Sequence, residues 1–135
     1  MSYKSIRTDI LGLVATQFPV AYPSIPAAWD NSPFDWSNPP ETFVWVEVDF
    51  QDADQVNIAV MPRTRYRGHV YVTVFVRNGA GTNNALDILD WFRGALAYRY
   101  AGAVQLREAK PDVRPDDSSG YRHFCIKVPF HSDGD

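Results

Sequence analysis

The clearest hydrophobic pattern in this chain is an alternation of valines between His69 and Arg77. The valines stand at every second position and share one face of an extended strand, while aromatic and hydroxyl side chains take the other face. Four β-branched residues on one face favour a strand that faces the core, so we predict a central strand here. Similar alternation predicts strands at 42–50, 55–61, 104–109 and 121–130, a polar turn at 51–54 and a short strand at 20–22.

Two other segments carry apolar residues at helical spacing. The first runs from Tyr3 to Phe18, where Pro19 is expected to stop the helix. The second covers about 84–99 and is expected to end by Gly102. Its apolar stripe consists of Ala85, Ile88, Leu89, Phe92, Ala95 and Leu96, and Tyr100 would extend it.

This order of elements predicts an α+β fold with a largely antiparallel or mixed β-sheet and two amphipathic helices packed on one face. The chain has 135 residues, so we expect one compact, soluble domain over 1–135. A proline- and tryptophan-rich arm or loop covers 23–41, and 110–120 is expected to be a mobile polar loop because it has few apolar anchors. The tail His131–Asp135 is expected to fray.

Composition removes several classes of function. A net charge of −3 does not favour nucleic-acid binding, and a single cysteine excludes an internal disulfide and a cysteine-based zinc site. No apolar run approaches the ~20 residues of a membrane span, and the first residues lack the apolar core of a signal peptide. We therefore expect synthesis in the cytoplasm, no membrane partner and no sequence-specific nucleic acid.

The search for catalytic or metal chemistry gives weak signals only. None of the three histidines stands in a metal-ligand spacing, and Asp112, Asp116 and Asp117 match no calcium loop. Cys125 and His123 share one strand face, but a nucleophile also needs an oxyanion donor, and the sequence supplies none. A half-buried structural cysteine is the better interpretation. The residues predict no enzyme, no cofactor and no metal.

Surface candidates for protein contact are aromatic or cationic. The 23–41 segment contains large aromatic side chains, and an ordered capping loop and an interaction arm explain it equally well. Three arginines spaced by two suit either a solvated strand edge or an acidic partner. Aromatic residues on one flank of the second helix and a leucine on the other could mark a binding surface or lie under a loop. The candidate interface residues are Trp29, Phe34, Trp36, Arg63, Arg65, Arg67, Leu86, Trp91 and Tyr98.

Several segments together resemble the tail terminator proteins of long-tailed, lambda-like bacteriophages. They are the helix ending in Phe18–Pro23, the strand Phe43–Val48, the segment Gly68–Val76 that leads through 79–82 into a helix with Ala85, Asp87, Ile88, Asp90 and Phe92, and the closing Val128–Phe130. The resemblance implies copies that form a closed ring, commonly a hexamer, in the neck region of the virion. Such a ring would sit on the tail tube, stop its growth and present a surface to the head connector.

A closed ring needs two different patches on each chain. The 23–41 segment and the aromatic flank of the second helix are candidates for them. Three other interpretations stay open: another neck or tail-completion protein, a small-ligand-binding or enzymatic domain with a pocket between Trp45 and the helices, and a nucleic-acid module that uses the arginine row.

Overall fold

The fold is α+β, with two helices and seven strands among the residues described. The computed structural model describes residues 2–29, 41–55, 63–77, 83–112 and 121–134, with the backbone alone at 29 and 134. In chain order the elements are α1 Tyr3–Ala21, β1 Ala27–Trp29, β2 Thr42–Gln55, β3 Thr64–Arg77, α2 Asn83–Leu96, β4 Tyr100–Ala101, β5 Val104–Leu106, β6 Lys110–Asp112 and β7 Tyr121–Gly134.

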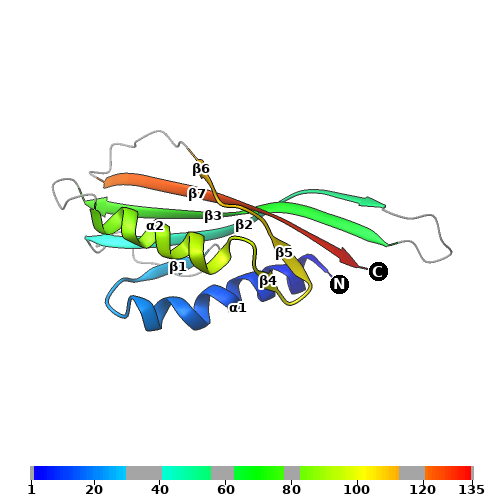
Figure 1. The fold of residues 1–135 in the computed structure, drawn as a ribbon, viewed down its shortest axis with the longest axis horizontal. Helices are drawn as coiled ribbons and strands as arrows, with labels where there is room; N and C mark the ends of the chain where they lie inside the picture. Colours follow the sequence, from blue (N-terminus) through cyan, green and yellow to red (C-terminus); the bar gives the residue numbers. More distant parts are fainter. Residues whose placement is uncertain (1, 30–40, 56–62, 78–82, 113–120, 135) are drawn as a thin grey trace.

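The strands form one mixed sheet in the order β1-β2-β3-β7-β5-β4. The short strand β6 also pairs with β7, at residues 125–127, whereas β5 pairs with residues 130–131. β1 runs parallel to β2, and the other neighbours are antiparallel. The predicted central strand is confirmed: β3 contains it and lies between β2 and β7. The predicted sheet with both helices on one face is also confirmed (Figure 1).

The core lies between this face of the sheet and the helices. α2 packs over β3 and β7, whereas α1 contacts β2 on one side and β4 and β5 on the other. The alternating valines of β2 and β3 point into this layer, and Val44, Val46, Val70, Val72 and Val74 are fully buried. From the helices, Ile6, Ile10, Val14, Phe18, Ala85, Ile88, Phe92 and Leu96 complete the core.

α1 continues past the predicted stop. Ser2 and Ser5 cap its start reciprocally, and the helix includes Pro19 and ends at Ala21. The predicted strand over 20–22 is therefore wrong. A proline in the last turn removes only its own N–H, and Tyr22 N–H still donates to the Phe18 carbonyl at 2.8 Å.

The predicted polar turn at 51–54 is wrong, because β2 continues through it to Gln55. The pairing with β3 shifts between Phe50 and Asp52, which indicates a bulge, and then resumes as far as Gln55 and Thr64. Residues 50–55 of β2 and 64–67 of β3 form an extension of the sheet, called the hairpin arm below, which projects past the helices (Figure 1). The end of β7 pairs with the β3 strand of this arm. The predicted strand at 55–61 falls almost wholly outside the described residues.

The second helix ends earlier than predicted, at Leu96. Tyr98 adopts a left-handed φ of 59°, and the Leu106 N–H donates to the Arg99 carbonyl at 2.8 Å, so pairing with β5 replaces the last helical turn. Tyr100 is thus on β4 and exposed, not on the core stripe. Gly102, also with positive φ, turns the chain between β4 and β5.

Two segments expected to lack structure are strands. Lys110–Asp112 pairs with β7 as β6, while 113–120 lies outside the described residues. The tail pairs with β3 as far as Gly134, and His131 also pairs with Gln105 of β5. A strand neighbour on each side supplies the backbone hydrogen bonds that a free tail would lack. The predicted strand at 104–109 is shorter, Val104–Leu106.

Candidate functional site

The most exposed aromatic residues of the described chain lie together just after α2. Tyr98 is 71% exposed and Tyr100 is 66% exposed. The segment Ala97–Tyr100, called the tyrosine turn below, carries both of them. A left-handed φ at a bulky residue such as Tyr98 costs conformational free energy, and such strained positions concentrate at functional sites.

The tyrosine turn is held by the segment that follows β5, to which Arg93 of α2 is also bound. The Tyr98 N–H donates to the Arg107 carbonyl at 3.4 Å. Glu108 accepts from Arg93 Nε at 3.0 Å and Nη2 at 3.3 Å. The hydrogen bonds from Arg93 lower the pKa of Glu108 below its ordinary value, and the Glu108 carboxylate raises the pKa of Tyr98. The tyrosine is therefore displayed in a defined position.

Grooves border the tyrosine turn on several sides. A groove of about 510 Å³ between α1 and α2, called the helix groove, is lined by Leu13, Gln17, Asp90, Trp91, Gly94, Ala95, Arg99 and Tyr100. Two further grooves, of about 460 and 470 Å³, both include Tyr98 and Glu108 in their linings. The turn is thus a ridge between hollows, a shape that suits contact with another macromolecule.

The other candidates on α2 are less accessible. Trp91 is half-buried, and its ring packs against Phe18 at 5.4 Å and Tyr22 at 6.1 Å, so it serves the edge of the core as well as the helix groove. Leu86 is 46% exposed. The sequence pattern predicted Trp91 and Tyr98 on one flank of the second helix. In the structure Trp91 is half-buried on α2, whereas Tyr98 is exposed on the tyrosine turn after the helix.

Most side chains of the aromatic candidates in the 23–41 segment lie outside the described residues. The backbone of Trp29 belongs to β1 and pairs with Val46 of β2. Its side chain, together with Phe34 and Trp36, lies outside the described residues.

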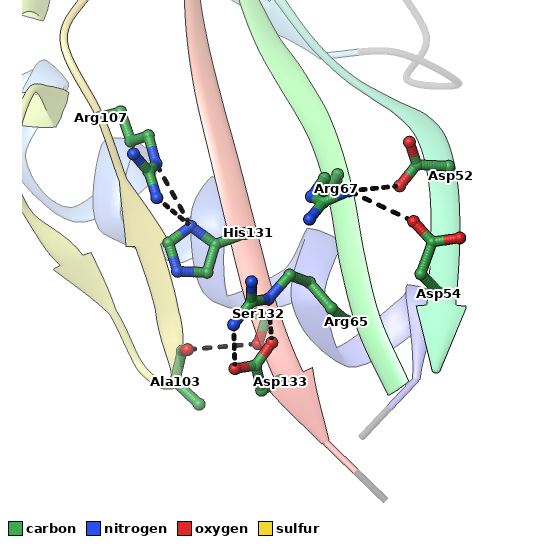
Figure 2. Close-up of polar contacts among 9 residues, drawn as sticks. All are labelled: Asp52, Asp54, Arg65, Arg67, Ala103, Arg107, His131, Ser132 and Asp133. Atoms are coloured by element: carbon green, nitrogen blue, oxygen red, sulfur yellow. Dashed lines mark hydrogen bonds and ion pairs between the residues drawn. The ribbon is translucent and has the colours of Figure 1, made fainter. Parts of the chain in front are cut away.

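The arginine row lies at the base of the hairpin arm. Arg65 and Arg67 share one face of β3, opposite the helices, and exposed Arg63 stands just before the strand. Arg65 makes a two-bond ion pair with Asp133, with Nε–Oδ1 at 2.8 Å and Nη2–Oδ2 at 3.0 Å. Arg67 approaches two carboxylates of β2, Asp54 at 3.2 Å and Asp52 at 3.8 Å (Figure 2).

Beside this row is a small cationic hollow, called the arginine pocket. Its volume is about 170 Å³, and its lining comprises Gln51, Arg65, Arg67, Gly68, His69, Arg107, Pro129, Phe130 and His131. Both Nε and Nη2 of Arg107 lie 3.4 Å from Nδ1 of His131 (Figure 2). Burial, followed by the charge of Arg107, lowers the pKa of His131, and burial, followed by Lys127, lowers the pKa of His69.

The remaining sequence candidates are placed by the sheet. Cys125 is buried more completely than the half-buried position expected, and it accepts from the Thr73 hydroxyl at 3.3 Å. Within the described residues no group of three or more His, Cys, Asp or Glu side chains could hold a metal ion; Asp116 and Asp117 fall outside them. The suggested pocket between Trp45 and the helices is wrong, because Trp45 alternates with Val44 and Val46 and faces away from both helices. None of the described helices is both long enough and apolar enough to span a membrane.

Sequence reasoning missed Tyr100, Arg107 and His131. Tyr100 fitted the helical stripe, and only the early end of α2 exposes it. Arg107 follows Val104 and Leu106 in alternation, a signal that could have placed it on the polar face of an extended segment. His131 continues the alternation of the last strand, which the assumed fraying concealed.

Comparison with known proteins supports the fold and nothing finer. No protein-family model matches the chain, and no curated protein is similar to it. A solved structure whose protein name describes no function shares the fold, with a TM-score of 0.66 and 19% sequence identity. The similarity covers 98% of this chain and 95% of that chain.

Proposed function

We propose that this chain is a structural assembly protein that forms a ring at the head-proximal end of a phage tail tube. In this role it ends tube growth and offers the joining surface for the head connector, without catalysing a reaction. The sequence resemblance supplies the class of assembly. The observation that supports a protein-contact role is the tyrosine turn, whose two tyrosines are 71% and 66% exposed between grooves.

The chemistry of the tyrosine turn suits a protein partner. Tyrosine combines a large apolar ring with a polar tip, and aromatic residues are enriched at interface centres. Because the Arg107 carbonyl, just after β5, holds the backbone of Tyr98, little backbone entropy is lost when a partner covers this residue. The hairpin arm projects elsewhere on the molecule, so one chain carries two different surfaces, as a head-to-tail ring requires.

The test must include the tube, because ring contacts can be weak until a template holds neighbours close together. The protein would be mixed with growing tubes of the tail-tube protein from the same genome, and tube length and end occupancy would be measured by electron microscopy. We expect tubes of defined length with one ring of this protein at the end. Tubes that grow on unchanged, with bare ends, would refute the proposal. A ring found on the head connector instead would assign the chain to another neck protein.

Tyr98→Ala tests the surface itself. Truncation of a central aromatic anchor costs ~2 kcal/mol or more, so capping should need at least tenfold more protein. Val20→Ala is the matched control, because Val20 is 82% exposed but lies at the end of α1, outside the tyrosine turn. Equal capping by both variants and the parent would exclude this surface.

A further inference from the structure

The arginine pocket has an unusual balance of charge. Every charged residue of its lining is cationic: Arg65, Arg67 and Arg107. The carboxylates that pair with two of them, Asp133 and the β2 aspartates, do not belong to the lining. The hollow therefore presents guanidinium groups and imidazoles to whatever enters it.

Arg107 is the cation least compensated by neighbouring charge. Its guanidinium meets an imidazole nitrogen of His131, and no carboxylate of the described chain lies within ion-pair distance of it. Because burial and the charges of Arg107 and Arg65 disfavour protonation of His131, that imidazole is an uncharged acceptor near neutral pH. An uncharged partner satisfies one donor direction of a guanidinium but does not balance its charge.

His69 adds a second, independent sign of a missing partner. The residue belongs to the lining of the same pocket, and its Nδ1, which is buried from solvent, has no hydrogen-bond partner within the described chain. A buried polar atom without a partner has lost its hydration and gained nothing in return, so structures rarely tolerate one unless a ligand or water completes it.

We propose that the arginine pocket binds a carboxylate group, held by Arg107 beside the ring of His69. A neighbouring arginine already binds a carboxylate in this way: Arg65 donates two parallel hydrogen bonds to Asp133. A volume of about 170 Å³ accommodates one such group with its adjoining methylenes. A monoanion also suits the surroundings better than a phosphate dianion, which the nearby Asp52, Asp54 and Asp133 would repel more strongly.

Acetate is the probe for the first arm of the test. Acetate would be titrated at constant ionic strength while the side-chain resonances of Arg107 and His69 are followed by NMR. We expect saturable shifts with a Kd on the order of 10 mM, since a few charge-assisted hydrogen bonds act on a very small ligand. Arg107→Gln should weaken binding at least tenfold, and Arg107→Lys should weaken it less. Arg99→Gln, an exposed arginine bonded to the Gly94 carbonyl, should bind like the parent.

Three outcomes would overturn the proposal. They are shifts that never saturate, equal affinity in the parent and in folded Arg107→Gln, and tighter binding of inorganic phosphate than of acetate under the same conditions. Circular dichroism establishes that the variants fold, which is expected because the Arg107 N–H donates to the Pro129 carbonyl whatever the side chain.

A second arm separates the two sources of such a carboxylate, a free small molecule and an acidic side chain of another copy of this chain. Sedimentation equilibrium at low salt would show association that acetate competes away and that Arg107→Gln abolishes, if the group belongs to a second copy. Acetate binding by a protein that stays monomeric would assign a small molecule. Neither arm uses a tail tube, so failure here is distinguishable from failure of the assembly proposal.

Discussion

β2 and β3 each cross two very different environments without a break in their pairing. Residues 42–50 of β2 and 68–76 of β3 lie under the helices, and their valines are buried. Residues 51–55 of the hairpin arm, in contrast, are all exposed. The ladder of backbone partners runs through both parts and shifts only at the bulge. Strand pairing thus sets the shape of both regions, but burial of apolar area stabilises mainly the first; in the arm it is contributed by Phe50 and Tyr66, which pack against Tyr3.

Gly68 marks the boundary between the two regions. It pairs with Phe50 of β2 and Phe130 of β7, and it is the last buried position of β3 before the arm begins. A Cβ built here would meet the Asp49 carbonyl oxygen and lie 2.8 Å from the Phe130 ring. The sheet therefore closes tightly at this point, and the arm leaves it through a position that only glycine fits.

The largest expected effect comes from a charge placed in the buried region. Val72→Asp would put an unpaired carboxylate into a layer where Val72 is fully buried, at a cost of about 3–5 kcal/mol. That is a large share of the total stability of a small domain, so thermal unfolding followed by circular dichroism should show a collapse of the transition.

Ala53→Asp is the control in the arm. Ala53 is exposed on the same β2–β3 ladder, and surface substitutions usually stay within ~0.5 kcal/mol. If Val72→Asp melted like its parent, the buried layer under α2 would not exist. If Ala53→Asp were as damaging as Val72→Asp, the arm would not be the solvated region described here.

Gly68→Ala should have the next largest effect. The nearest atom is backbone and cannot move aside cheaply, so overpacking should cost roughly 1–3 kcal/mol, measured by urea unfolding. Gly12→Ala is its matched control in α1, where an added Cβ meets nothing within 4 Å and improved helix propensity should stabilise by ~0.5–1 kcal/mol. A tolerated Gly68→Ala would mean that the boundary is not tightly closed.

Much of the fold was readable from the sequence because period-2 and period-3.6 patterns report burial directly. The valine alternation at 69–77 placed β3 at the centre, and the stripe containing Ile88 and Phe92 placed the buried face of α2. The errors occur where tertiary pairing overrides local signals. Residues 51–54 look like a turn because they are polar, but a strand with a paired neighbour tolerates polar side chains on both exposed faces.

The candidate sites were less predictable because they join residues that are distant along the chain. The arginine row was visible as a spacing of two, yet its partner Asp133 lies in a tail expected to fray, and Arg107 comes from the segment just after β5. The exposure of Tyr98 follows from a left-handed turn that captures the end of α2 against β5. The hydrophobic pattern of the sequence does not predict that the end of a helix will pair with a later strand.

Acid should lower the stability of the fold through His69 and His131, which lie where the hairpin arm joins the rest of the sheet. The pKa values of His69 and His131 are both lowered from about 6.5, first by burial. Between each folded pKa and 6.5 the unfolded chain therefore binds more protons, so stability should fall as pH drops below about 6.5. Around His69 the charges of Lys127 and Lys110 add to this effect, while those of Asp49 and Asp112 oppose it.

Chemical denaturation at several pH values would measure the slope. His69→Gln and His131→Gln should each flatten it, and a stability profile that is level between pH 7 and 5 in the parent would contradict the assigned burial. Asp133 affects stability at lower pH. The hydrogen bonds from Arg65 lower the pKa of Asp133, so this carboxylate stabilises the folded state above about pH 3.8, and that stability is lost as pH falls through the folded pKa.

The smallest expected effect comes from an exposed ion pair of the hairpin arm. Arg67 and Asp54 are 3.2 Å apart, with 46% and 58% of their side chains exposed, so a double-mutant cycle with Arg67→Gln and Asp54→Asn should give a coupling of roughly 0.2–1 kcal/mol. Screening by salt should remove most of it, because both groups are in water. The cycle repeated at 1 M salt is the internal control. A coupling well above this range, or one that salt leaves unchanged, would mean that the arm is covered in solution by another chain, since only desolvation makes such a pair strong and insensitive to salt.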